Sequence, residues 1–143
     1  MIFLDRTTIG ALADWQDQVH KKLPDPDMYA QKARDFESLP INDKRRRSGF
    51  TQYAPEVLPI SRGRPTFPAV WNSDKRVKDA LDAWSHGKCA YCESLINARH
   101  SQQVEHFKPK SLFPSLAYDW SNYFLACDGC NSAKLDKWTG TGD

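Results

Sequence analysis

The sequence predicts an α+β fold in which a helical N-terminal part precedes a compact ββα unit. Apolar residues recur at helical spacing in the first 40 residues, and two short apolar segments of strand character lie near residues 105 and 124. A Cys-x-x-Cys pair flanks each end of that second region, which indicates a small unit closed by its own cysteines. A chain of 143 residues suits one domain with a helical appendage, and we divide it into residues 1–70 and 71–143.

Two helices are predicted in the N-terminal part. The first covers residues 7–23, where apolar side chains recur at helical spacing until Pro24 ends the pattern. The second begins after an Asp27 cap and stops before Pro40. The residues assigned to its apolar face are Met28, Ala33 and Phe36.

Residues 40–70 form a long connection that holds five of the nine prolines, so we expect little regular structure in it. Long connections often bind partners, and we assign residues 1–70 as a whole to partner docking. The net charge of the chain is only +2, but residues 44–64 hold six basic residues and one acidic residue. This stretch suits either the phosphates of a nucleic acid or an ordinary solvated loop. The candidates for a nucleic-acid contact are Arg45, Arg46 and Arg47.

The second part begins with a well-defined amphipathic helix. It starts at Ser73 or Asp74, and Gly87 suits the left-handed position that commonly follows a helix. The residues of its apolar stripe are Val77, Ala80, Leu81 and Trp84. The helix leads directly into the first cysteine pair.

Two strands and a short helix are predicted after that pair. Residues 103–107 alternate in polarity and end before Pro109, and residues 122–126 form a second apolar strand. Residues 130–138 complete the ββα unit as a short helix.

The cysteines favour a structural Zn²⁺ site, because the two residues between each pair let both sulfurs approach one ion. A thioredoxin-like redox pair is one alternative, although it does not explain the duplication, and buried cysteines without a ligand are another. Two histidines, His86 and His100, lie near enough in sequence to compete as ligands but lack the paired spacing. The four cysteines of the chain are Cys89, Cys92, Cys127 and Cys130.

Glu105 and His106 form an adjacent carboxylate–imidazole pair on the first predicted strand. Neighbouring side chains on an ideal strand point to opposite faces, so a shared role requires the strand to end or bulge there, and Pro109 favours such a break. A neutral imidazole can take a proton from water, and a carboxylate suits a hard ion such as Mg²⁺. Taken alone, such a pair more often satisfies a structural hydrogen bond.

The order of these motifs is more specific than any one of them. Cys-x-x-Cys, Val-Glu-His-Phe-x-Pro, Trp-x-Asn and Cys-x-x-Cys-Asn-x-x-Lys follow one another over residues 88–134. This order resembles the HNH endonuclease family, whose zinc-stabilised ββα-metal unit it matches. The segments 87–93 and 105–110 look like the HNH nucleases of Septu-type and retron-associated anti-phage systems.

The resemblance implies a role for each matched residue. His106 is the expected general base, and Glu105 and Asn131 are the expected ligands of a catalytic Mg²⁺ or Mn²⁺ ion. Asn122 matches the asparagine that braces the loop between the strands through backbone hydrogen bonds. We expect nucleic-acid contacts from Lys108 and Lys134, although a solvated lysine is an equal alternative for the second.

The resemblance also implies an activity and a partner. We expect a metal-dependent endonuclease that cuts DNA, with RNA as an alternative substrate, and that works beside an ABC/SMC-like ATPase. A second hypothesis is a non-catalytic, zinc-stabilised interaction module that docks through its N-terminal helices and the aromatic-rich residues 50–71.

No apolar run approaches the ~18 residues of a membrane span, and residues 1–6 lack the features of a signal peptide. We therefore expect a cytoplasmic protein, in which reduced thiols favour metal binding over disulfides.

Overall fold

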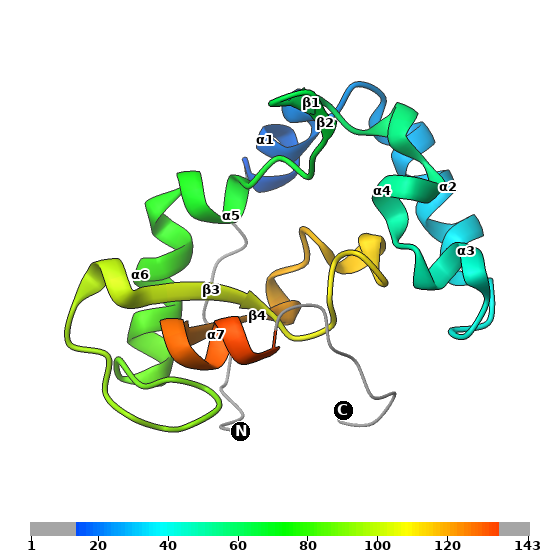
Figure 1. Ribbon diagram of the computed structural model, residues 1–143. Helices are drawn as coiled ribbons and strands as arrows, with labels where there is room; N and C mark the ends of the chain where they lie inside the picture. The colour runs from blue at the N-terminus through cyan, green and yellow to red at the C-terminus, as the bar shows by residue number, and fades with distance from the viewer. Residues whose placement is uncertain (1–13, 135–143) are drawn as a thin grey trace.

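The computed structural model describes residues 14–134, with the exception of the Arg99 side chain. Helices and strands both occur, and the predicted α+β class is confirmed (Figure 1). Parts of two predicted helices, residues 7–13 and 135–138, lie outside the described residues.

The N-terminal part begins with two helices, α1 (Trp15–Lys22) and α2 (Pro26–Glu37). The cap of α2 is Asp25 and not Asp27, because Pro26 occupies the first helical position and the Asp25 side chain accepts a hydrogen bond from the Met28 N–H at 3.0 Å. The prediction of Met28 as a core residue is wrong, since it is 45% exposed and Tyr29 beside it is buried. Ala33 and Phe36 are buried as predicted.

The proline-rich connection contains only short elements. They are α3 (Lys44–Arg47), α4 (Phe50–Tyr53), the 3₁₀ turn η1 (Pro55–Val57), the hairpin β1 (Ile60–Ser61) and β2 (Arg64–Pro65), and α5 (Val70–Ser73). The hairpin turns at Arg62 and Gly63, which have φ angles of 52° and 77°. Little regular structure was expected here, and no described element of this segment exceeds four residues.

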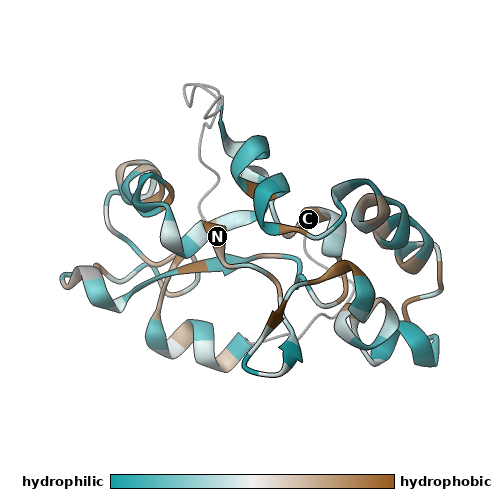
Figure 2. Cartoon of the chain, turned by 90° about the horizontal axis from the view of Figure 1, so that it is seen from above, coloured by the Kyte–Doolittle hydropathy of each residue, from teal (hydrophilic) through white to brown (hydrophobic). Residues whose placement is uncertain are grey.

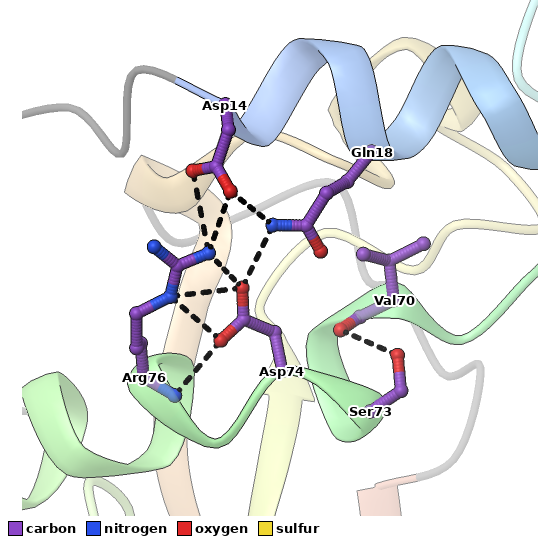
Figure 3. A network of polar contacts seen from close by, with 6 residues as sticks. All are labelled: Asp14, Gln18, Val70, Ser73, Asp74 and Arg76. Carbon is purple, nitrogen blue, oxygen red and sulfur yellow. Dashed lines mark hydrogen bonds and ion pairs between the residues drawn. The ribbon is translucent and has the colours of Figure 1, made fainter.

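Helix α6 (Lys75–Ser85) follows the Asp74 cap as predicted and buries Val77 and Leu81. Its left-handed end includes His86 at φ 55° in addition to Gly87 at φ 73°. Asp74 also joins α6 to α1, because the Arg76 guanidinium lies between Asp74 and Asp14 at 2.6 and 3.1 Å (Figure 3).

An antiparallel hairpin of β3 (Gln102–His106) and β4 (Tyr123–Cys127) forms the centre of the C-terminal part. Its register pairs Gln102 with Cys127 and His106 with Tyr123. Helix α7 (Asp128–Lys134) lies across one face of the hairpin and α6 lies on the other (Figure 1). The predicted strands are each displaced by one residue, and α7 begins two residues earlier than expected.

The segment between β3 and β4 covers residues 107–122 and contains two 3₁₀ turns, η3 (Pro114–Leu116) and η4 (Trp120–Asn122). Side chains of the N-terminal helices hold this segment in place. Trp15 Nε1 donates to the Tyr118 carbonyl at 2.8 Å, and the Tyr29 hydroxyl donates to the Pro114 carbonyl at 2.7 Å. The Glu37 carboxylate accepts from the Ser115 N–H and hydroxyl at 2.9 and 2.7 Å.

One buried apolar cluster crosses the boundary predicted at residue 70, running from Trp15 and Val19 through Trp71 to Tyr123 and Ala126. Figure 2 shows that the helices are largely hydrophilic along their length, with hydrophobic residues in short stretches. The division at residue 70 therefore remains a prediction about function, because the two parts share one core. None of the helices in the described part of the chain is long and apolar enough to cross a bilayer.

Candidate metal centre and active site

The four cysteine sulfurs converge as the spacing predicts, with all Sγ atoms within 4.8 Å of one another. The first pair lies in a turn before β3, Cys127 ends β4, and Cys130 lies in α7. Tetrahedral Zn²⁺ with Zn–S bonds of ~2.3 Å requires sulfurs about 3.8 Å apart, and the Sγ atoms of Cys92 and Cys127 are 4.0 Å apart. The donor set and its dimensions therefore fit a zinc ion.

The first cysteine pair occupies a tight turn that is fixed by backbone hydrogen bonds. The Glu93 N–H donates to the Cys89 carbonyl and the Cys89 N–H donates to the Ser94 carbonyl, both at 2.9 Å. Glu93 accommodates the turn at φ 61°. The Ala90 N–H donates to the Leu125 carbonyl at 2.8 Å, which attaches the turn to β4. A backbone hydrogen bond between the first turn and β4 thus helps to keep the two cysteine pairs close together.

The convergence of both cysteine pairs favours a bound cation over a redox pair. Hydrogen bonds with Ser94 lower the pKa of Cys92 to about 6, whereas the hydrogen bond with Cys127 raises the pKa of Cys130 to about 12. Thiols this close compete for protons, and a metal ion is what allows all of them to be thiolates together. All four sulfurs lie in one cluster, whereas a thioredoxin-like redox site would need only one Cys-x-x-Cys pair.

A pocket of about 280 Å³ lies at the end of β3. The strand ends at His106, as a shared role for Glu105 and His106 requires, and both residues line the pocket. Asn131 of α7 lines the same pocket, so three residues predicted from the sequence are brought together. The other lining residues are Trp71, Asn72, Gln103, Val104, Pro109 and Lys110.

The His106 ring is buried and its tautomer is fixed. Its Nε2 lies 2.9 Å from the backbone carbonyl oxygen of Ala117, in the segment between the strands. A carbonyl oxygen can only accept, so Nε2 carries the proton and Nδ1 is left as the basic nitrogen. The Trp71 ring, centred 4.4 Å away, and the Tyr123 ring, centred 5.2 Å away, hold the imidazole edge-on.

The same surroundings keep His106 neutral. Burial, and to a smaller extent the ammonium of Lys110, lower the pKa of His106 to about 4, against an opposing effect of the hydrogen bond to Ala117. The imidazole is therefore unprotonated at neutral pH and can accept a proton.

Glu105 is only 4% exposed, and Lys134 of α7 neutralises it. The Lys134 Nζ lies 3.2 Å from Glu105 Oε1 and donates to the His106 backbone carbonyl at 3.0 Å. The carboxylate and the Asn131 amide supply oxygen donors to one pocket, which suits Mg²⁺ or Mn²⁺. The direction of Lys134, toward the carboxylate, was not anticipated from the sequence.

Asn122 hydrogen-bonds to the backbone at two points of the loop between the strands. Its Oδ1 accepts from the Lys108 N–H at 2.8 Å, and its Nδ2 donates to the carbonyls of Lys108 and Leu116 at 3.0 and 3.2 Å. The side chain is buried, and it closes residues 108–122 into a loop. Asn122 therefore shapes the segment that presents the Ala117 carbonyl to His106.

The predicted nucleic-acid contacts separate into two groups. Arg46 is 6% exposed, and its guanidinium donates to the carbonyls of Glu37, Leu39 and Leu112 at 2.9–3.3 Å. This burial corrects the interpretation of Arg46 as a nucleic-acid contact, because its donors are directed into the protein. Arg45 and Arg47 are exposed on the same short helix, although Arg45 pairs with Asp43 at 3.2 Å. Lys108 lies over the Phe113 ring at 5.5 Å.

Sequence reasoning missed Trp71 and Lys110, which line the pocket, and the Ala117 carbonyl, which orients His106. Lys110 directly follows Pro109 and could have been found from its place in the Lys-Pro-Lys segment. Nothing in the local sequence indicates that Trp71, 35 residues before His106, contacts the histidine ring. The position of a backbone carbonyl such as that of Ala117 leaves no mark in the sequence.

Comparison with known proteins agrees with this geometry. Residues 89–137 match the family model described as HNH endonuclease. This part of the chain is an HNH domain. It contains the cysteine cluster, both strands and α7.

Two curated relatives carry the printed name Septu protein PtuB. The protein from Bacillus mycoides (strain KBAB4) is 36% identical over an alignment covering 46% of this chain and 26% of the relative. The protein from Bacillus thuringiensis is 37% identical, with the same coverage of 46% and 26%. The chain thus spans about a quarter of the length of these relatives. No solved structure matches it significantly.

Proposed function

We propose that this protein is a metal-dependent endonuclease that hydrolyses phosphodiester bonds of DNA and serves as the nuclease of an anti-phage defence system. The observation that carries the proposal is the pocket at the end of β3. It is lined by a neutral, oriented His106, by the Glu105 carboxylate and by the Asn131 amide, and it lies within an HNH domain.

His106 is proposed as the general base that activates water. Its Nε2–H donates a hydrogen bond to the Ala117 carbonyl, so Nδ1 is the atom that takes the proton from water. A pKa of about 4 makes a weak base in the substrate-free protein. The negative charge of a bound phosphate favours the imidazolium and so raises that pKa when it is needed.

Glu105 and Asn131 would hold the catalytic Mg²⁺ or Mn²⁺ ion. When bound, the ion supplies charge neutralisation on the phosphate and the leaving oxygen. The four cysteines would hold a separate, structural Zn²⁺ ion that fixes the position of α7, the helix on which Asn131 lies.

The basic side chains near the pocket support a nucleic-acid substrate. Lys110 lines the pocket and lies 5.6 Å from the Trp71 ring, and Lys108 precedes it in the same loop. The buried guanidinium of Arg46 ties helix α3 to this loop through the Leu112 carbonyl. Arg45 and Arg47 on α3 would extend the contact along the phosphate backbone, with RNA as the alternative substrate.

We also propose an ABC/SMC-like ATPase partner, which the resemblance to Septu-type nucleases implies, and both relatives carry a Septu name. The N-terminal helices offer it a surface, since α1, α2 and residues 114–120 line a hollow of about 560 Å³ with Trp15, Tyr29 and Trp120 among its walls. The protein would act in the cytoplasm, where phage DNA is encountered.

Plasmid cleavage tests the proposal. Zinc-loaded protein is incubated with supercoiled plasmid, with and without added Mn²⁺ or Mg²⁺, and then with the product of the neighbouring gene. Leaving the ion out is preferable to adding a chelator, which would also remove zinc. We expect nicking that depends on the added ion. No cleavage under any of these conditions, from a folded and zinc-loaded protein, would refute it.

A non-catalytic interaction module is the competing function, and the hollow between α1 and α2 favours it. It predicts binding of the partner with no plasmid cleavage at any ion concentration. It also predicts that His106→Ala leaves all measurable properties except stability unchanged.

A further inference from the structure

The contact between Lys134 and Glu105 has a consequence for metal binding. The Lys134 ammonium lies 3.2 Å from Glu105 Oε1, and the two side chains are only 16% and 5% exposed. A second hydrogen bond to the His106 backbone carbonyl, at 3.0 Å, fixes the ammonium at this position. The carboxylate expected to bind a divalent ion is therefore already paired with a cation of the protein itself.

Two cations cannot share this carboxylate at low cost. Charges a few ångströms apart repel strongly where water is excluded, and a buried carboxylate is stable only while some cation accompanies it. A divalent ion that binds Glu105 must either remain close to the Lys134 ammonium, at an electrostatic cost, or displace it. Since the ion brings the larger charge, the ammonium is the group that can leave.

We propose that Lys134 is an internal competitor for the catalytic ion, whose ammonium neutralises Glu105 in the metal-free protein and is displaced when Mg²⁺ or Mn²⁺ binds. This inference rests on the proposed function in treating Glu105 as a ligand of that ion. The displaced ammonium lies beside the His106 pocket, where an entering phosphate is the available counter-ion. Metal and nucleic acid should therefore favour each other's binding.

Amine labelling of the wild-type protein tests the displacement directly. Zinc-loaded protein in chelator-free buffer is treated with an acetylating reagent, with and without Mg²⁺, and the modification of each lysine is measured by mass spectrometry. We expect Lys134 to be protected without Mg²⁺ and to be labelled several-fold faster with it. Lys108 is the internal control and should label equally in both. Equal labelling of Lys134 in both conditions would overturn the proposal.

Metal affinity provides the second test. Calorimetric titration of Mn²⁺ into zinc-loaded Lys134→Gln should give binding on the order of tenfold tighter than wild type, because the competing charge is gone. Lys108→Gln removes the same charge from the loop after β3, where the Lys108 ammonium lies over the Phe113 ring, and should change the affinity little. Unchanged or weaker binding to Lys134→Gln would contradict competition and would make Lys134 a positioning residue instead.

Neither readout depends on DNA cleavage, so this inference and the proposed function can fail separately. Equal Mn²⁺ affinity in wild type and Lys134→Gln overturns the competition alone. No Mn²⁺ binding by either protein overturns the competition together with the catalytic-ion part of the proposed function. If Lys134→Gln does not fold, the labelling of the wild-type protein decides.

Discussion

The His106 imidazole donates from Nε2 to the carbonyl oxygen of Ala117 at 2.9 Å, across eleven residues of chain. This bond makes the orientation of the candidate base depend on the segment between the two strands. That segment depends in turn on the N-terminal helices, through Trp15, Tyr29 and Glu37. The part of the chain assigned to docking thus supports the geometry of the pocket.

Replacing the bracing asparagine should loosen the loop. Asn122→Ala removes the three hydrogen bonds that the side chain makes to the backbone of Lys108 and Leu116, so we expect a loss of about 2–4 kcal/mol in the free energy of unfolding. Urea denaturation measures it, with the exposed Asn97→Ala as the matched control. Equal midpoints for the two variants would show that the brace contributes nothing.

The two arginines at positions 46 and 47 should behave differently. Arg46→Ala leaves the carbonyls of Glu37, Leu39 and Leu112 without their donors, so we expect it to cost about 2–4 kcal/mol of stability. Arg47→Ala should leave the melting temperature unchanged and weaken DNA binding, with a shallower salt dependence. Thermal melts and fluorescence anisotropy at several salt concentrations measure both. The reverse pattern would refute the assignment of Arg46 to the protein interior.

Loss of one cysteine should remove the metal and unfold the C-terminal unit. Cys89→Ser and Cys130→Ser each leave three thiolates, and the binding energy of a structural Zn²⁺ is folding energy. Elemental analysis and circular dichroism measure zinc content and structure, with Ser61→Ala, an exposed residue of β1 outside the cluster, as the control. A folded Cys130→Ser protein without zinc would show that the ion is dispensable.

Stability should depend on pH through His106. Its pKa is about 4 in the folded chain and 6.5 ordinarily, so between these values the unfolded chain binds more protons. The free energy of unfolding should therefore fall as the pH drops from 6.5 to 4, by roughly 3 kcal/mol from this residue. Urea denaturation across this range, compared between wild type and His106→Gln, isolates the contribution. Parallel pH profiles for the two proteins would contradict a buried neutral imidazole.

The candidate site residues that could be grouped from the sequence are those whose relationship is local or repeated. Their patterns are recognisable within a few residues of sequence. They are the two cysteine pairs, the adjacent Glu105 and His106, and Pro109, which follows the strand. The orientation of His106 could not be predicted, because it comes from a backbone carbonyl and from Trp71, which is brought near only by the fold.

The burial of one arginine in the basic run of residues 44–47 could not be predicted from the sequence either. Nothing in Lys-Arg-Arg-Arg distinguishes the middle arginine from its neighbours, yet a four-residue helix lying on the core must turn one side inward, and here that residue is Arg46. Lys134 likewise has the sequence context of a phosphate contact, and only the crossing of α7 over β3 directs it to Glu105.

The proposed role of His106 as the base of a phosphodiester hydrolysis is tested by comparing cleavage rates. Rates of plasmid nicking are measured with Mn²⁺ for wild type, His106→Ala and the exposed His100→Ala, after zinc content and folding are shown to be equal. We expect His106→Ala to lose at least about a hundredfold in rate, while His100→Ala retains the wild-type rate. Equal nicking by His106→Ala and wild type would contradict it.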